Sequence, residues 1–151
     1  MADPIEIKFT VPGEPVGKAR PRARIVRTRA GGEFVSMYTP KKTQSEEGAI
    51  RMFANLAMAG KPPMAGPLEL HVCAYVPVSA SWSKKRQADC LAGRAFPVGK
   101  PDADNYGKLV MDAMNSIVYV DDAQVVSAVF HKRFSDRPRI VVVVKPKIPN
   151  V

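Results

Sequence analysis

The stretch that organises this sequence is residues 100–108, which read Lys-Pro-Asp-Ala-Asp-Asn-Tyr-Gly-Lys, with residues 117–122, which read Ile-Val-Tyr-Val-Asp-Asp. Apolar residues recur at helical spacing between the two segments, so a helix is predicted over 105–115. Carboxylates at this density disfavour folding unless cations neutralise them. Because all the candidate ligands are oxygens, the pattern favours Mg²⁺ or Mn²⁺ over zinc.

Each of these polar residues also has a plainer explanation. Asp104 lies where a helix cap or first turn is expected, and capping accounts for it as well as metal binding does. Capping accounts for Asp102 less well. Asp121 and Asp122 follow a predicted strand over 117–120, where an ordinary turn is the alternative. Lys108 either forms a surface ion pair with Asp104 or stabilises charge on a phosphate.

The helix of about three turns predicted between the acidic segments matters for their geometry. A helix followed by an antiparallel strand brings the two acidic ends within reach of each other. We therefore expect one acidic cluster rather than two.

The charge of the chain is unevenly distributed. The net charge is +9 over 151 residues, yet residues 101–124 hold five aspartates against the single Lys108. A basic body around one acidic spot indicates a polyanionic ligand with a cation at its centre. A basic surface that only maintains solubility is equally compatible with the charge.

Two basic clusters are candidate DNA-backbone contacts. The first lies in residues 14–32, interpreted as a mobile basic arm or loop that orders on phosphates; a solvated, disordered run is the alternative. The second begins a short helix predicted over 81–93. The candidate contacts are Lys18, Arg20, Arg22, Arg24, Lys84, Lys85 and Arg86.

The length and patterning predict one α+β domain over residues 1–151 with a mixed sheet. Strands are predicted over 5–11, 33–38, 68–76, 117–120, 123–134 and 139–145, and a further helix over 39–60 with Thr39 as its cap. No apolar run is long enough for a membrane span, and the first eight residues show no secretory signal. Cys73 and Cys90 fit no metal spacing, so both are expected to be reduced thiols in the cytoplasm.

The acidic motif is similar to that of a known family. Lys-Pro-Asp-x-Asp-Asn-x-x-Lys, a helix and then Val-Tyr-x-Asp-Asp-Ala-Gln-Val-Val resembles the RusA-like Holliday junction resolvases, which are crossover junction endodeoxyribonucleases. Residues 11–22, 38–42 and 81–86 also resemble that family, so the similarity runs from about residue 5 to 145. One departure is Tyr106-Gly107 in the first helical turn, since a glycine there costs roughly 1 kcal/mol of helix propensity.

The resemblance implies a homodimeric α+β enzyme, encoded by a bacterium or a phage, that acts in DNA recombination and repair. Such enzymes resolve four-way DNA junctions by paired symmetric cuts that require Mg²⁺, with Mn²⁺ as a possible substitute. The implied catalytic residues are Asp102, Asp104, Asp122 and Lys108, and the implied metal ligands are the same three aspartates with Asp121. Two alternatives stay open: a non-catalytic module that binds branched or single-stranded DNA, and a structural domain whose acids are caps and turns.

Overall fold

The computed structural model describes residues 5–150. Residues 1–4, part of the start where no secretory signal is expected, and residue 151 lie outside the described part. The elements along the chain are β1 (Ile7–Pro12), β2 (Arg22–Arg27), β3 (Glu33–Tyr38), α1 (Lys41–Met58), β4 (Leu68–Val76), α2 (Lys84–Leu91), α3 (Ala103–Ala113), the 3-10 turn η1 (Asp122–Gln124), β5 (Val125–Phe134) and β6 (Arg139–Pro146).

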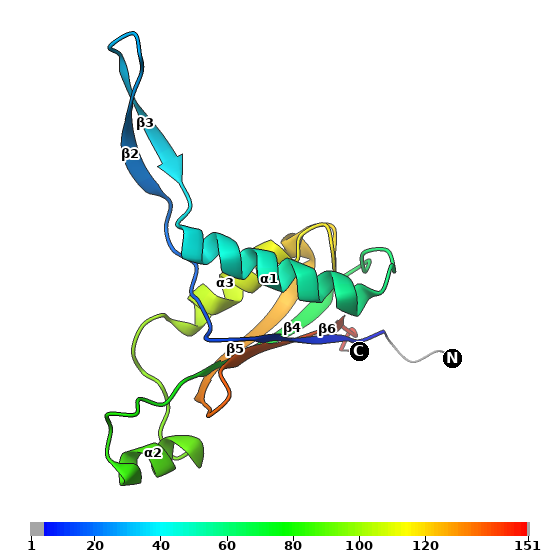
Figure 1. Cartoon of the computed structure of the whole chain (residues 1–151). Coiled ribbons are helices and arrows are strands. Elements are labelled where there is room, and N and C mark those ends of the chain that lie inside the picture. The colour runs from blue at the N-terminus through cyan, green and yellow to red at the C-terminus, as the bar shows by residue number, and fades with distance from the viewer. Residues whose placement is uncertain (1–4, 151) are drawn as a thin grey trace.

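Four strands form one mixed sheet in the order β1-β6-β4-β5 (Figure 1). β4 runs parallel to β5 and antiparallel to β6, and β6 runs antiparallel to β1. The parallel pair requires a long connection, and residues 77–124 supply it. This architecture confirms the predicted α+β fold with a mixed sheet, and the strand predicted over 68–76 is one of its two inner strands.

The core lies between the sheet and two helices, α1 and α3, that pack on the same face of it (Figure 1). Alternate residues of the strands point into this core, as the period-two pattern predicted. The fully buried side chains on the two central strands are Leu68, Leu70, Val72, Ala74, Ile140, Val142 and Val144. α1 contributes Ile50, Ala54 and Met58, which recur every four residues on one side of the helix.

The predicted strand over 117–120 is wrong, because this segment forms buried turns. Ser116 adopts a positive φ of 67° and reverses the chain immediately after α3. Ile117, Val118 and Tyr119 are then all buried in the core. The Tyr119 hydroxyl donates a hydrogen bond to the Met111 carbonyl, at 2.7 Å. Residues 117–119 pack under α3 and do not join the sheet.

The helix starts agree with the sequence to within two residues. Pro40, rather than Thr39, is the N-cap residue of α1. Ser83 caps α2 and accepts a hydrogen bond from the Arg86 backbone N–H, at 3.2 Å. Among residues 5–150 no helix combines the length and the apolar content needed to cross a bilayer.

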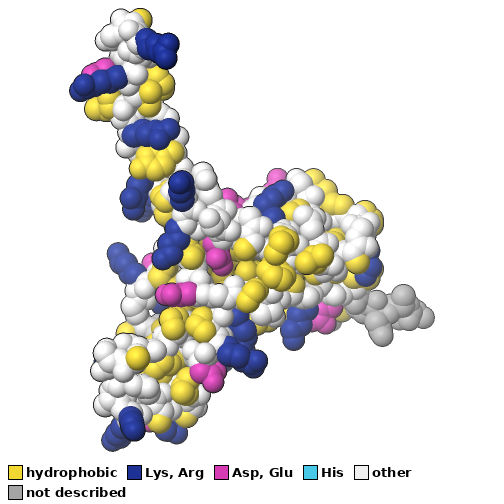
Figure 2. Space-filling view, viewed as in Figure 1, with side chains coloured by type: hydrophobic (Ala, Val, Ile, Leu, Met, Phe, Trp, Pro, Cys, Tyr) yellow, Lys and Arg dark blue, Asp and Glu magenta, His cyan; other side chains and the backbone are white. Residues whose placement is uncertain are grey.

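Two parts project from the body: the antiparallel hairpin β2–β3 and the segment that carries α2 (Figure 1). Residues 22–27 form a strand where the sequence predicted part of an arm or loop. Basic and apolar residues alternate along most of that strand, a pattern masked by its high charge. Lysine or arginine and apolar side chains are interleaved along the hairpin surface (Figure 2).

Candidate functional site

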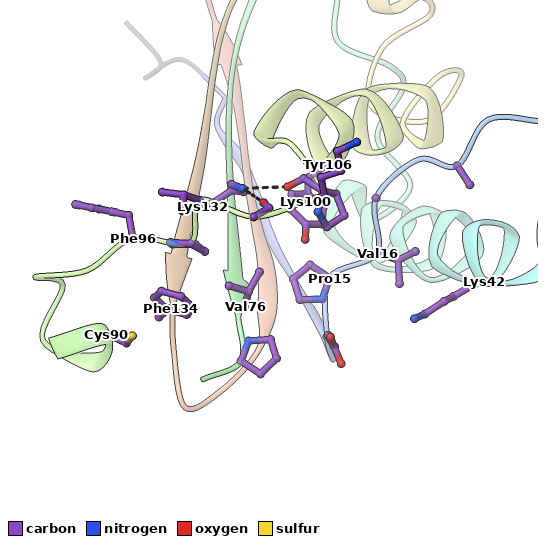
Figure 3. Close-up of a pocket in the computed structure, with 18 of the residues that line it drawn as sticks. Pro15, Val16, Lys42, Val76, Cys90, Phe96, Lys100, Tyr106, Lys132 and Phe134 are labelled. Carbon is purple, nitrogen blue, oxygen red and sulfur yellow. Dashed lines mark hydrogen bonds between the residues drawn. The ribbon is translucent and has the colours of Figure 1, made fainter. Parts of the chain in front are cut away.

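The loop that leads into α3 is held in place by residues from two distant parts of the chain. Lys132 on β5 donates hydrogen bonds from Nζ to the carbonyl oxygens of Gly99, at 2.7 Å, and Pro101, at 3.0 Å (Figure 3). Gly17 packs so closely that a Cβ atom on it would lie 2.7 Å from the Pro101 Cβ. Because Asp102 follows Pro101 directly, these contacts also fix the position of Asp102.

Asp102 is the N-cap residue of α3, but its side chain makes no capping hydrogen bond. Only its backbone takes part, since its carbonyl oxygen accepts from the Asn105 N–H at 3.1 Å. Capping therefore does not account for a carboxylate at position 102. The exposed side chain is available to a ligand.

Asp104 lies in the first turn of α3, one turn before Lys108. Its Oδ2 atom is 3.4 Å from Lys108 Nζ, and the two side chains are 55% and 63% exposed. An exposed ion pair at this spacing contributes only about 0.3–0.5 kcal/mol. Both groups can therefore exchange this contact for one with a ligand at little cost.

Gly107, the departure from the family pattern, is explained by packing. It is buried, and a Cβ atom on it would lie 2.5 Å from the ring of Phe130 on β5. Any larger residue would push α3 away from the sheet. The glycine thus allows the helix to lie close to β5 with Asp104 and Lys108 on its outer side.

Asp121 and Asp122 differ in what they do locally. The Asp121 side chain accepts from the Ala123 N–H at 2.9 Å, and the Gln124 side chain accepts from the Asp121 N–H at 3.2 Å. These two bonds form a capping box at the start of η1. The Asp122 backbone N–H donates to Asn115 Oδ1 at 2.8 Å, and the Asp122 carboxylate takes no part in the capping box. The turn accounts for Asp121 but not for the carboxylate of Asp122.

The electrostatics around Tyr119 indicate a strongly negative spot. Burial, reinforced by the neighbouring Asp121, raises the pKa of Asp122 above its usual range. The Ala123 N–H and then Asp122 lower the pKa of Asp121. Burial raises the pKa of Tyr119, and the charges of Asp122, Asp112 and Asp121 raise it further. A cation is therefore favoured at this end of α3.

Asp112 is a residue that the sequence reasoning missed as part of the site. It forms an ion pair with Lys18, whose backbone N–H also donates to the Asn105 carbonyl at 3.3 Å. The available signal was its spacing, since Asp104, Lys108 and Asp112 follow one another at four-residue intervals along one helical face. Lys18 was expected to contact DNA, and here it ties the segment before β2 to α3.

The structure places the acids in two groups rather than one. Asp102 and Asp104 lie at the start of α3, while Asp121 and Asp122 lie beyond its end. Asp104 and Asp112 alone are separated by about 12 Å along the helix axis. Within residues 5–150 no three acidic, histidine or cysteine side chains converge as a metal cluster. The antiparallel return expected from the sequence does not occur, because residues 117–120 turn under α3.

A cavity of about 750 Å³ adjoins the loop before Asp102 (Figure 3). Its wall includes five cationic side chains from five separate parts of the chain and one acidic side chain, Glu14. The cationic residues are Arg22, Lys42, Arg86, Lys100 and Lys132. The cavity is therefore suited to an anionic ligand, and it unites Arg22 and Arg86 from the two predicted basic clusters.

The remaining basic candidates stay exposed. Arg20 and Arg24 lie along the hairpin side of the molecule, and Lys84 and Lys85 lie in the first turn of α2. The Arg86 guanidinium stacks over the Trp82 ring at 3.7 Å. Trp82 itself packs edge-on against Phe134, with ring centroids 5.7 Å apart, so it anchors the α2 segment to β5.

Comparison with known proteins agrees with the motif. A protein of Bacillus subtilis (strain 168), named "Uncharacterized protein YqaN", is 37% identical over 141 residues, which cover 92% of this chain and 95% of that protein. The family model described as Endodeoxyribonuclease RusA matches residues 12–145. The chain therefore belongs to the RusA endodeoxyribonuclease family, as the acidic motif predicted.

Proposed function

We propose that this protein is a Mg²⁺-dependent endodeoxyribonuclease that resolves four-way DNA junctions by paired, symmetric hydrolysis of phosphodiester bonds. The observation that carries the proposal is the Asp102 carboxylate. It occupies a cap position without a capping hydrogen bond, two residues before Asp104 and beside a cationic cavity, in a chain of the RusA family.

The donor set suits a magnesium ion. Mg²⁺ retains several waters and is commonly held by one or two carboxylates together with substrate phosphates, so a closed protein cage is not required. Asp102 and Asp104 would supply such a pair at the start of α3. When bound, a divalent cation supplies Lewis-acid stabilisation of the phosphate and activates water. Mn²⁺ has the same preference for oxygen ligands.

The second acidic group would contribute Asp122 from beyond the end of α3, apart from the pair formed by Asp102 and Asp104. Its carboxylate takes no part in the capping box, whereas Asp121 holds the turn that presents it. We therefore assign the catalytic role to Asp122, with Asp121 as its neighbour in metal binding. Lys108 would stabilise charge on the phosphate after leaving its weak pair with Asp104.

The basic residues would hold the DNA backbone without reading its sequence. Arg22 and Arg86 would act at the cavity, and Arg20, Arg24, Lys84 and Lys85 on the surfaces around it. Lys18 would act nearest the site, because its pair with Asp112 keeps it along α3. Paired cuts require two active sites, so we propose a homodimer whose twofold axis matches that of the junction.

A nicking assay on a synthetic four-way junction tests this function. Wild type is expected to make paired cuts with Mg²⁺ and none in EDTA. The rate of cutting is expected to fall about 100-fold or more in each of three variants, Asp102→Asn, Asp104→Asn and Asp122→Asn. This is the scale of losing one preorganised electrostatic contact. The matched control is Asp136→Asn, an exposed aspartate in the turn between β5 and β6, which should cut normally.

Other outcomes of this assay separate the alternatives. Tight junction binding by wild type without cutting under any divalent ion would replace the enzyme with a non-catalytic DNA-binding module. Normal cutting by Asp104→Asn and Asp122→Asn would leave the enzyme class intact and remove the site assignment. Mn²⁺ binding, measured by calorimetry, provides a readout independent of turnover and should weaken in Asp102→Asn.

A further inference from the structure

The β2–β3 hairpin has two chemically different faces. Cross-strand partners share a face, and successive residues alternate between faces. One face carries the pairs Arg22–Tyr38, Arg24–Ser36 and Val26–Phe34, and the other carries Ala23–Met37, Ile25–Val35 and Arg27–Glu33. The first face is therefore basic and aromatic, whereas the second is largely apolar. We call the first one the basic–aromatic face.

The charges on the two faces differ in their pairing. On the apolar face Arg27 is neutralised by Glu33, with Nε and Oε1 3.1 Å apart. On the basic–aromatic face neither Arg22 nor Arg24 pairs with a carboxylate within residues 5–150. The Arg24 guanidinium instead lies over the Tyr38 ring, 5.3 Å from its centroid. This face therefore presents uncompensated positive charge beside an aromatic ring.

The aromatic rings of this face lie in solvent. Phe34 is 52% exposed and Tyr38 is 37% exposed, and the hairpin extends away from the body instead of lying on the sheet or a helix (Figures 1 and 2). An isolated two-stranded hairpin is marginally stable in water, and leaving two rings uncovered adds to that cost. Both observations are accounted for by a ligand that covers the rings.

We propose that the basic–aromatic face binds unpaired nucleobases of DNA, which stack on Phe34 and Tyr38 while Arg22 and Arg24 contact the flanking phosphates. Phe34 and Tyr38 are four residues apart on β3, so their rings lie about 13 Å apart and would take two different bases. A continuous duplex keeps its base faces covered by stacking, whereas a branch point or single strand exposes them. The proposal rests on the proposed function only in taking DNA as the ligand.

The test compares neighbouring residues that point to opposite faces. Binding of a fluorescently labelled 12-nucleotide single strand is measured by anisotropy in EDTA, where no cutting occurs, and compared with a duplex of the same sequence. Phe34→Ala and Tyr38→Ala should each weaken single-strand binding by about fivefold or more, the lower end of the loss of one stacked base. Val35→Ala and Met37→Ala, on the apolar face, should each change it less than twofold.

A second comparison separates stacking from apolar contact and from loss of the hairpin. Phe34→Trp should retain single-strand affinity, and Phe34→Leu should lose it. Neither Phe34 variant should alter the salt dependence of DNA binding, because that dependence comes from the arginines. Arg24→Gln, in contrast, should lower the slope of log affinity against log salt by about one. If the hairpin merely unfolded, duplex affinity and the salt slope would fall together with single-strand affinity.

The proposal is overturned if Phe34→Leu binds the single strand as tightly as wild type does. It is overturned as well if Val35→Ala and Phe34→Ala weaken single-strand binding equally. It is also overturned if wild type shows no preference for the single strand over the duplex. These results would leave the proposed nuclease untouched, because junction cutting with Mg²⁺ is measured separately. Loss of cutting in Asp104→Asn supports the proposed nuclease alone, whereas the base-stacking proposal is judged from the Phe34 and Tyr38 variants.

Discussion

Gly107 shows how one atom sets the distance between the candidate site and its scaffold. In a free helix a glycine costs roughly 1 kcal/mol relative to alanine. Here the missing Cβ lets α3 rest against the Phe130 ring, and the helix carries Asp104 and Lys108 at the distance that this contact fixes. Helix propensity at this position is therefore lower, and a close packing contact is made in return. A residue that appears unfavourable in sequence is required by the fold.

Gly107→Ala is therefore expected to lower the free energy of unfolding by about 1–3 kcal/mol, the usual cost of overpacking, despite its better helix propensity. Gly48→Ala in α1 is the matched control, because that glycine is exposed and a Cβ there meets nothing within 4 Å. In the control variant the free energy of unfolding should rise by about 0.5–1 kcal/mol. Urea denaturation measures the free energy of unfolding of both variants. Equal effects at the two positions would contradict the packing argument.

At the scale of the elements, the site depends on contacts between segments that are distant in sequence. β5 supplies Lys132, whose ammonium holds the carbonyls of Gly99 and Pro101 ahead of Asp102. The segment before β2 supplies Lys18, which pairs with Asp112 on α3. Each contact joins a basic side chain to the helix that carries the acids. The position of α3 is accordingly determined from both of its ends.

Lys132→Met should keep the packing of the lysine stem while removing the two hydrogen bonds to the loop. We expect junction cutting to fall by about 10–100-fold, the usual effect of losing a group that orients a metal ligand, with little change in junction affinity. Lys132→Arg should recover part of the rate. Mn²⁺ affinity provides a second measurement that does not depend on cutting, and it should weaken in Lys132→Met. An unchanged Mn²⁺ affinity together with full activity would show that the loop needs no such support.

At the scale of the whole molecule, basic residues from separate elements surround one cavity. Arg22 from the hairpin and Arg86 from α2 line it together. Counterion release then makes junction binding strongly dependent on salt. Further Lys and Arg side chains lie along the hairpin and over the rest of the face that Figure 2 shows.

Arg22→Gln and Arg86→Gln should each reduce the slope of log affinity against log salt by about one, with binding weakened similarly for all sequences. Arg94→Gln is the control, because Asp89 already neutralises Arg94, with Nε and Oδ1 2.8 Å apart. Anisotropy titrations of a four-way junction between 50 and 200 mM salt, the range over which such slopes are measured, provide the slopes. A slope that falls equally in the control would mean that the cavity has no special role.

The sequence predicted the fold well where the side-chain pattern alone decides the structure. The strand predicted over 68–76 and the helix predicted over 39–60 are both present, and the helix packs through Ile50, Ala54 and Met58. The prediction failed over 117–120, because a buried apolar run has no periodicity that distinguishes a strand from a buried turn.

The same limit applies to the candidate site. The motif identified the family and the two acidic segments, but the distance between them depends on how residues 117–120 pack, which only the fold settles. The capping aspartate Asp121 and the non-capping aspartates Asp102 and Asp122 also look alike in sequence. Lys132 and Asp112 were missed because their importance depends on contacts with residues far along the chain.

The long connection between β4 and β5 has a consequence for the order of folding. Residues 77–124 hold α2, α3 and all four aspartates of the two acidic pairs, and the parallel strands that flank them cannot pair until this whole segment is closed into a loop. Closing a long loop costs chain entropy before any contact repays it, so non-local parallel pairing is slow. A chain that has formed only its hairpin and helix α1 therefore still lacks the scaffold on which its acids are placed. The two acidic pairs therefore reach their final positions only when the loop between β4 and β5 closes.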